Sequence, residues 1–225
     1  MRNIFIIVTA ALVFVGGKSS AQFGIVNDEL IRTGIKNNTL VEKYANIEGN
    51  PYFFKDWVKG KITISKGVVD TTSLLKFDQV ENKLFVKGDA EDVYTFKEVV
   101  AKFTLVGEKS THNFECGFPK TADTDEFTYF EVFNSGKTKI ARRTVKVIEE
   151  YKPYSGAMVK QIAENQKYYL CKSGTATIPV KLDKKEILQN LSDKQKEVED
   201  FLSKKKLNLK KIEDVTKLLD YYNSL

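Results

Sequence analysis

Val69-Asp70-Thr71-Thr72-Ser73-Leu74-Leu75-Lys76-Phe77 is the stretch that decides the fold of this chain. Every second residue from Val69 to Phe77 falls on one face of an extended segment, which is the period of a half-buried β-strand. The same period returns on both sides of this stretch, at Ile62 and Ile64, at Leu84 and Val86, and from Ala101 to Leu105. We therefore expect the middle of the chain to form strands.

More strand-like runs follow along the chain, at residues 127–133, 138–151, 167–171 and 176–180. Turn residues separate the runs, among them Gly88, Gly107 and Asn134-Ser135-Gly136. Parallel strands would need crossover helices between them, and the sequence has no amphipathic segments there. The pattern predicts an antiparallel meander that forms a curved sheet or partial barrel. Residues 158–165 are the exception, where we expect one or two helical turns.

After Leu182 the apolar period becomes helical. Asp183 with Glu186, and Ser192 with Gln195, have the spacing of a capping box, so each pair marks a helix start. One helix is expected from about Asp193, and another from about Leu209. The second carries an apolar stripe at Ile212, Val215, Leu218, Leu219 and Tyr222. The fold class predicted from these periods is α+β, with a short helical C-terminal region.

The first 21 residues have the features of a secretory signal peptide. Arg2 precedes an apolar run from Ile4 to Val15, and small residues follow up to Ala21. No later stretch approaches the roughly 18 apolar residues of a membrane span, so we expect no transmembrane segment after signal cleavage. The predicted organisation is a signal peptide at 1–21, a helical or irregular segment at 22–59 with a short helix near 28–35, a β domain at 60–181, and helices at 182–225.

Charge and composition argue against several classes of function. The formal net charge of +6 is modest. The lysines at 204–206 alternate with nearby acids, so we predict no nucleic-acid partner. A triad of serine, histidine and acid would have to use His112, the sole histidine, which lies in the polar stretch 109–113 and is interpreted as a surface residue. The sequence predicts no catalytic residue, no cofactor and no metal site.

Two groups of residues are candidate sites. Tyr52, Phe54 and Trp57 precede the first confident strand and could stack on a glycan or an apolar ligand, although aromatic residues there could instead plug the sheet. Cys116 and Cys171 each fall within an expected strand. In an oxidising compartment a disulfide between them is chemically reasonable, and a pair of buried free thiols is the alternative.

The N-terminal third of the chain resembles a family of small exported proteins from Bacteroidetes. The residues that carry the resemblance are Pro51-Tyr52, Phe54, Trp57 and Gly60, followed by Leu75-Lys76-Phe77-Asp78. The resemblance covers about the first third to half of the chain, and the ending at 205–225 is also similar. It implies an exported envelope protein of a Gram-negative bacterium and no particular activity. The location expected is the periplasm or an association with the cell envelope, with secretion as the alternative, and the predicted helical ending favours retention in the periplasm.

The leading functional hypothesis is a non-enzymatic module that binds an envelope protein, a glycan or an apolar ligand on the concave face of the sheet. The alternative is a hydrolase of envelope polymers that uses paired carboxylates. A third reading is a structural module with protein contacts alone. An apolar cavity would favour the ligand binder, and a sealed core with an exposed apolar patch would favour the interaction module.

Overall fold

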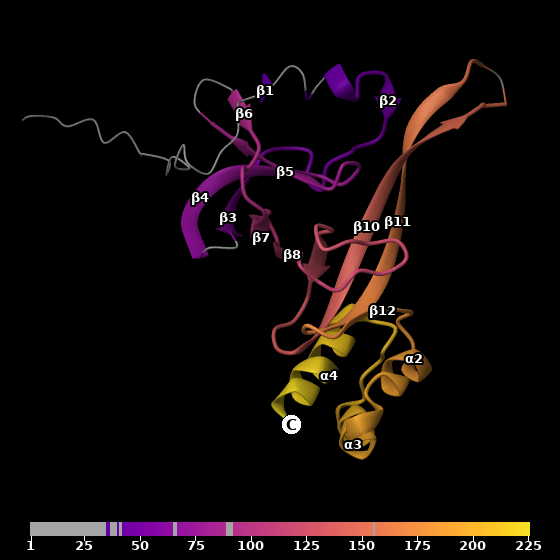
Figure 1. Cartoon of the computed structure of the whole chain (residues 1–225). Coiled ribbons are helices and arrows are strands. Elements are labelled where there is room, and N and C mark those ends of the chain that lie inside the picture. Colours follow the sequence, from indigo (N-terminus) through magenta and orange to yellow (C-terminus); the bar gives the residue numbers. More distant parts are fainter. Residues whose placement is uncertain (1–34, 37–39, 41, 65–66, 89–91, 155) are drawn as a thin grey trace, which may run out of the picture.

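The computed structural model describes residues 35–36, 40, 42–64, 67–88, 92–154 and 156–225 (Figure 1). The expected signal peptide and nearly all of the expected helix near 28–35 lie outside these residues. The described strands are β1 (Ile35–Lys36), β2 (Ile47–Glu48), β3 (Val58–Ile64), β4 (Gly67–Asp78), β5 (Lys83–Lys87), β6 (Asp92–Tyr94), β7 (Val100–Val106), β8 (Thr111–Glu115), β9 (Phe130–Val132), β10 (Thr138–Tyr151), β11 (Val159–Lys172) and β12 (Ala176–Val180). The helices are α2 (Lys184–Gln189), the 3₁₀ turn η2 (Ser192–Lys194), α3 (Gln195–Lys205) and α4 (Ile212–Ser224).

All the described strands belong to one sheet, in the order β1-β6-β5-β4-β3-β7-β8-β9-β10-β11-β12. Neighbours along this path pair antiparallel, and β2 lies off the path, where it pairs in parallel with β11. The sheet is curved and open, and the helices follow it in the chain (Figure 1). The predicted α+β class with a mainly antiparallel sheet is therefore confirmed.

The hairpin of β10 and β11 is the longest element of the molecule. All 14 residues of β10 pair with residues of β11, from Thr138 opposite Lys172 to Tyr151 opposite Val159. The helical turns expected at 158–165 are therefore wrong, because this segment belongs to β11. Its residues find cross-strand partners such as Ile148 opposite Ile162, and this pairing outweighs local helical tendency.

The inner face of the first half of the sheet is filled by aromatic side chains. Ile62, Phe103 and Phe114 stand in register on β3, β7 and β8, so they share one face. Phe77 packs against both phenylalanines with ring centroids about 5 Å apart. Phe53 and Tyr129 cover the cluster from the segments outside the strands. These residues form the hydrophobic core of the first half of the sheet.

A second core joins the helices to the lower end of the hairpin. Ile140 and Leu170 are fully buried against Ile187, Leu191 and Leu218 of the helical region. The capping box at Asp183 is confirmed in its first half, because the Asp183 carboxylate accepts from the amide of Glu186 at 2.9 Å. The box expected at Ser192 is wrong. Ser192 begins η2, and α3 starts at Gln195 without a side-chain cap.

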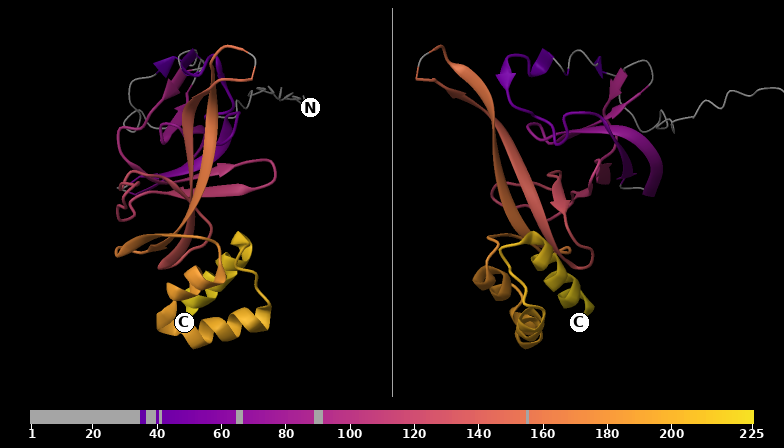
Figure 2. Two further views of the ribbon diagram at one scale, coloured as in Figure 1. Left: turned by 90° about the vertical axis from the view of Figure 1, so that its right-hand side faces the viewer. Right: turned by 180° about the vertical axis from the view of Figure 1, so that it is seen from behind.

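Seen from two further sides, the hairpin runs from the helices at its lower end, past the first half of the sheet, to a free tip (Figure 2). The helices pack on its lower end, while β2 and the chain after it lie beside its upper part. The lower half of the hairpin is thus a structural element of the core. The upper half, residues 144–151 and 159–167, extends beyond it.

Candidate functional site: the upper hairpin

The aromatic candidates Tyr52, Phe54 and Trp57 do not form one surface. Phe54 packs on the inner core of the sheet, whereas Trp57 packs on a separate cluster with Leu40, Phe85 and Val93. Tyr52 contacts Tyr44 edge-to-face at 5.9 Å between ring centroids. This segment therefore helps to seal the sheet, as the structural interpretation of these residues predicted.

Lys76 connects two of the three aromatic candidates. Its ammonium lies 4.6 Å from the ring centroid of Tyr52 and 5.2 Å from that of Trp57, which are cation–π distances. Burial lowers the pKa of Lys76. A pocket of about 440 Å³ lies beside this pair, lined by Tyr52, Lys76 and Tyr44, but Phe54 and Trp57 do not line it. The predicted stacking platform is not assembled here.

Both cysteines are free in the structure. Cys116 is partly buried and its thiol donates to the carbonyl of Val100 at 3.4 Å, while Cys171 is buried beside Phe130 and Tyr169. Burial raises the pKa of Cys116 to about 11 and that of Cys171 to about 12. Thiols in this state are weak nucleophiles and pack as small apolar groups.

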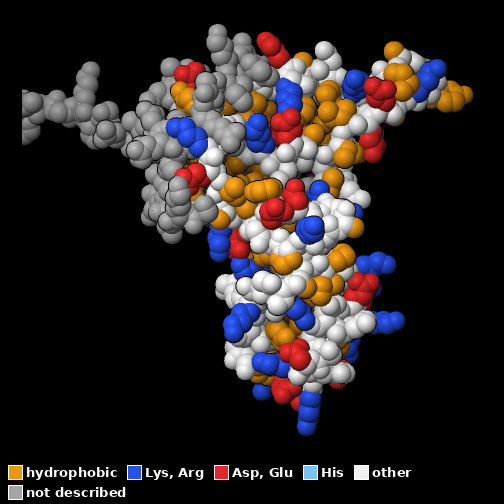
Figure 3. Space-filling view, in the orientation of Figure 1, with side chains coloured by type: hydrophobic (Ala, Val, Ile, Leu, Met, Phe, Trp, Pro, Cys, Tyr) orange, Lys and Arg blue, Asp and Glu red, His pale blue; other side chains and the backbone are white. Residues whose placement is uncertain are grey.

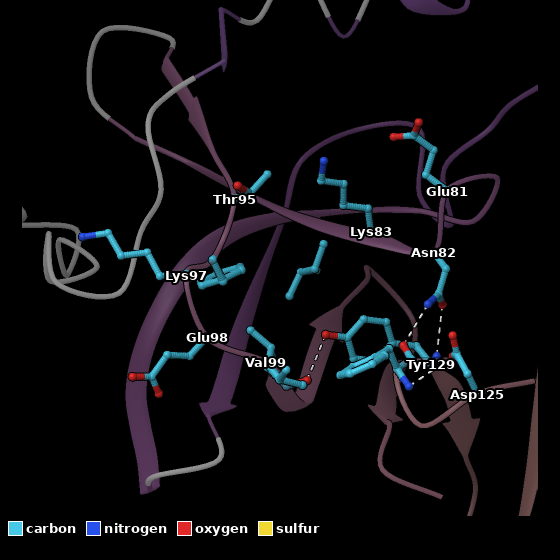
Figure 4. Close-up of a pocket in the computed structure, with 13 residues that line it drawn as sticks. Glu81, Asn82, Lys83, Thr95, Lys97, Glu98, Val99, Asp125 and Tyr129 are labelled. Carbon is cyan, nitrogen blue, oxygen red and sulfur yellow. Dashed lines mark hydrogen bonds between the residues drawn. The ribbon is translucent and has the colours of Figure 1, made fainter. Parts of the chain in front are cut away.

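A pocket of about 480 Å³ lies between β5 and the chain before β9 (Figure 4). Two polar side chains in its wall have structural partners. The Asn82 amide donates to Phe127 O at 2.9 Å and accepts from Tyr129 N at 3.0 Å, and the Tyr129 hydroxyl donates to Val100 O at 2.9 Å. These hydrogen bonds fasten residues 127–129 to the sheet, so both side chains have a structural role in the wall of this pocket.

The upper hairpin has a different character, because one of its edges is open. β9 pairs with β10 only at Ala141 and Arg142, and the amide of Phe133 donates to Ile140 O on that same side. Backbone groups of alternate residues point to the same side of a strand. The N–H and C=O groups of Thr144, Lys146, Ile148 and Glu150 therefore face this edge. In the described part of the chain no strand pairs with it.

Apolar side chains are exposed on both faces of the upper hairpin. Val147 and Ile148, which point to opposite faces, are each 43% exposed, and Met158 near the tip is 58% exposed. Tyr151 and Tyr154 extend the apolar surface to the end of the hairpin, where Figure 3 shows hydrophobic side chains at the projecting tip. The exposed apolar side chains are therefore concentrated in the upper hairpin.

One face of the upper hairpin is hollowed into a groove of about 550 Å³. Its floor is apolar, from Val145, Val147 and Ala163, and Asp123 closes its lower end. Asp123 accepts from Lys167 at 2.7 Å, from the Tyr169 hydroxyl at 3.2 Å and from Thr121 at 2.9 Å. The hydrogen bond from Lys167 is the main reason that the pKa of Asp123 is lowered. These hydrogen bonds thus hold the Asp123 side chain in place at the lower end of the groove.

A buried cation joins the upper hairpin to the N-terminal segment, in addition to the pairing of β2 with β11. Lys146 is only 7% exposed, and its ammonium donates to Asn50 O at 2.9 Å and to Tyr52 O at 2.8 Å. Glu164 lies 3.6 Å away across the hairpin, and burial lowers the pKa of Lys146. Gly49, at φ +102°, allows this segment to approach Ile162 closely. The hairpin therefore packs on the N-terminal segment through Lys146 and Ile162 and leaves one edge of β10 without a strand partner in the described residues.

His112 does not have the surface position that the sequence suggested. It lies on β8, next to the inner core, and its ring contacts Ser110 and Glu131. The sequence could not show this, because Glu131 lies 19 residues further along the chain. The open edge of β10 was also missed, since strand neighbours are a tertiary property.

No family model, curated protein or solved structure matches this chain. Among the helices that the structure describes, none combines the length and the apolar character needed to cross a bilayer. Fold and site together define a class, an α+β protein whose curved sheet carries a projecting, open-edged hairpin.

Proposed function

We propose that this protein is an exported envelope module that works by binding another protein, and that it binds an extended strand of that partner along the open edge of β10. The observation that carries the proposal is the unpaired edge of eight residues, Thr144 to Tyr151, beside exposed apolar side chains. Export is supported by the signal-peptide features of residues 1–21 and by the family resemblance.

Strand addition fits the chemistry of this edge. A partner strand would receive main-chain hydrogen bonds from the four outward-facing residues, and its alternate side chains would contact the apolar groove floor. The chain already uses its hairpin in this way on the other edge, where β2 adds to β11 at Lys160 and Gln161. A bound peptide would therefore repeat an interaction that the molecule makes with its own N-terminal segment.

The packing of the inner core favours a binding site elsewhere on the molecule. Phe77, Phe103 and Phe114 fill the inner face of the first half of the sheet, which favours a binding site outside this core. Two acids of the hairpin are paired with cations, Glu164 with Lys146 and Glu150 with Lys160. A hydrolase that uses paired carboxylates is therefore not favoured by this region.

Peptide display provides a direct test, because the natural partner need not be known. A library of random extended peptides is selected on the wild-type protein and counter-selected on an Ile148→Pro variant. Proline at 148 removes an N–H that faces the open edge, and edge positions tolerate proline in a folded sheet. We expect enriched peptides with alternating apolar residues, whose affinity for the variant falls by about tenfold or more.

The matched comparison is Val147→Pro, where the lost N–H faces β11 inside the hairpin. This variant should lose stability, whereas Ile148→Pro should keep the circular dichroism spectrum and unfolding midpoint of the wild type. Peptides that bind Ile148→Pro as tightly as wild type, or a selection that enriches none, would overturn the proposal.

A further inference from the structure

Ser110, His112 and Glu131 form a continuous chain of hydrogen bonds. The Ser110 hydroxyl oxygen lies 2.7 Å from Nε2 of His112, and Nδ1 of His112 lies 2.6 Å from Oε1 of Glu131. Both distances are within the range expected for a nucleophile and its base. Ser110 is exposed and Glu131 is buried, so the chain runs from solvent into the molecule.

The directions of these hydrogen bonds follow from the groups involved. An ionised carboxylate only accepts, so the proton of a neutral His112 lies on Nδ1, facing Glu131. Nε2 then holds a lone pair and accepts from the Ser110 hydroxyl. This is the order of groups in a serine–histidine–acid triad, which is recognised by geometry and roles.

Neighbouring residues hold the acid and the imidazole in position. Arg142 donates to Oε2 of Glu131 from Nε at 2.9 Å and from a terminal nitrogen at 2.5 Å, which leaves Oε1 for the histidine. The rings of Phe53 and Phe54 contact the His112 ring edge-to-face, with centroids 4.8 and 5.6 Å away. The imidazole is therefore fixed by packing on one side and by hydrogen bonds at both nitrogens.

The turn that carries Ser110 is also fixed. The amide of Gly107 donates to Ser110 O at 2.9 Å, which closes the turn between β7 and β8. A side chain at Gly107 would come within 2.7 Å of the Phe54 ring, so glycine lets that ring pack against the turn. Phe54, expected as a ligand contact, here supports the turn beside His112.

We propose that Ser110 is a base-activated nucleophile that accepts the acyl group of a short carboxylic ester, an activity separate from strand binding at the hairpin. The Ser110 oxygen attacks the ester carbonyl while its proton passes to Nε2 of His112. The ester C–O bond then breaks, and the leaving alcohol takes that proton. A water molecule then attacks the acyl carbon while His112 takes its proton. The bond between that carbon and the Ser110 oxygen breaks, Ser110 takes the proton back from His112, and the carboxylic acid leaves, so water and the ester are the only reactants.

The test uses two probes on the full mature chain, p-nitrophenyl acetate and a fluorophosphonate. Peptide mapping by mass spectrometry then locates the modified serine. We expect modification at Ser110, and a decrease of about 10²-fold in its rate in His112→Asn, since a general base contributes at least that much. Ser173 provides an internal comparison, because it is also an exposed serine in a hairpin turn, between β11 and β12.

Glu131→Gln distinguishes a positioned base from a mere neighbour. Glutamine keeps the shape but weakens the hold on the Nδ1 proton, so the rate at Ser110 should fall while the rate at Ser173 stays unchanged. Circular dichroism checks that each variant is folded. If His112→Asn does not fold, the test relies on Glu131→Gln alone. Equal modification of Ser110 and Ser173, no modification of either, or a rate that is unchanged in the folded variants would overturn the proposal.

Discussion

The ammonium of Lys146 donates to the carbonyl oxygen of Tyr52 at 2.8 Å, although 94 residues separate the two in the sequence. This contact joins the hairpin to the segment that seals the inner core. Both ends of it are removed from water, because Lys146 is nearly buried. The hydrogen bonds from Lys146 to Asn50 O and Tyr52 O thus join the β2–β11 pairing in holding the upper hairpin against the N-terminal segment.

Replacing Lys146 with methionine should destabilise the protein. Methionine fills a similar volume but removes the ammonium donor of Asn50 O, while Tyr52 O keeps only its hydrogen bond from Asn50 Nδ2. Loss of a donor to a carbonyl removed from water costs about 1–3 kcal/mol. Urea unfolding of the two proteins measures the difference. Lys160→Met, at an exposed lysine paired with Glu150, should change stability by no more than about 0.5 kcal/mol. Equal effects at the two positions would show that the carbonyl contacts do not stabilise the fold.

The two expected helix caps differ in the structure and should differ in energy. Asp183→Ala removes an observed cap and should cost about 1 kcal/mol. Ser192→Ala removes a serine that caps no helix in the structure, and should cost a few tenths of a kcal/mol at most. Thermal or urea unfolding distinguishes the two, and a larger loss for Ser192→Ala would contradict this assignment of the caps.

Acid should weaken the hydrogen bonds that Asp123 accepts at the lower end of the groove. Its pKa is lowered in the folded state, chiefly by the hydrogen bond from Lys167. The unfolded chain therefore takes up this proton at a higher pH, and the stabilisation is present above about pH 4 and is lost as the pH falls through the folded value. The urea midpoint is measured between about pH 6 and pH 3, a range that includes the ordinary pKa of an aspartate. We expect the midpoint to fall less steeply with acid for Asp123→Asn than for the wild type. Asp200→Asn, on an exposed face of α3, should retain the wild-type slope.

The cysteines should be counted as thiols, since the structure has both free. With pKa values raised to about 11 and 12, little thiolate exists at neutral pH, so an aromatic disulfide reagent should react slowly with the native protein. In denaturant without reductant both thiols should react at once. No reactive thiol under those conditions would mean that Cys116 and Cys171 are bonded.

The sequence predicted several strands together with their boundaries. Residues 138–151 and 176–180 are strands at the expected boundaries, because turn residues flank each run and β11 pairs with each of them over its whole length. The α4 stripe, with Val215, Leu218 and Leu219 buried, also followed from spacing alone. Local apolar periodicity and capping residues determine these elements, so they can be predicted without the tertiary structure.

Other features depended on residues far apart in the chain. Residues 158–165 became a strand because β10 lies opposite them, and Tyr52, Phe54 and Trp57 separated because each packs on a different cluster. Ser110 and His112 are neighbours in sequence, but only the sheet brings Glu131 and Arg142 to them. The sequence by itself determined the strand periods and the C-terminal helices, and the signal peptide stays a prediction. Tertiary structure decided the open edge of β10 and the hydrogen-bonded triad, because pairing and burial arise only between segments that meet on folding.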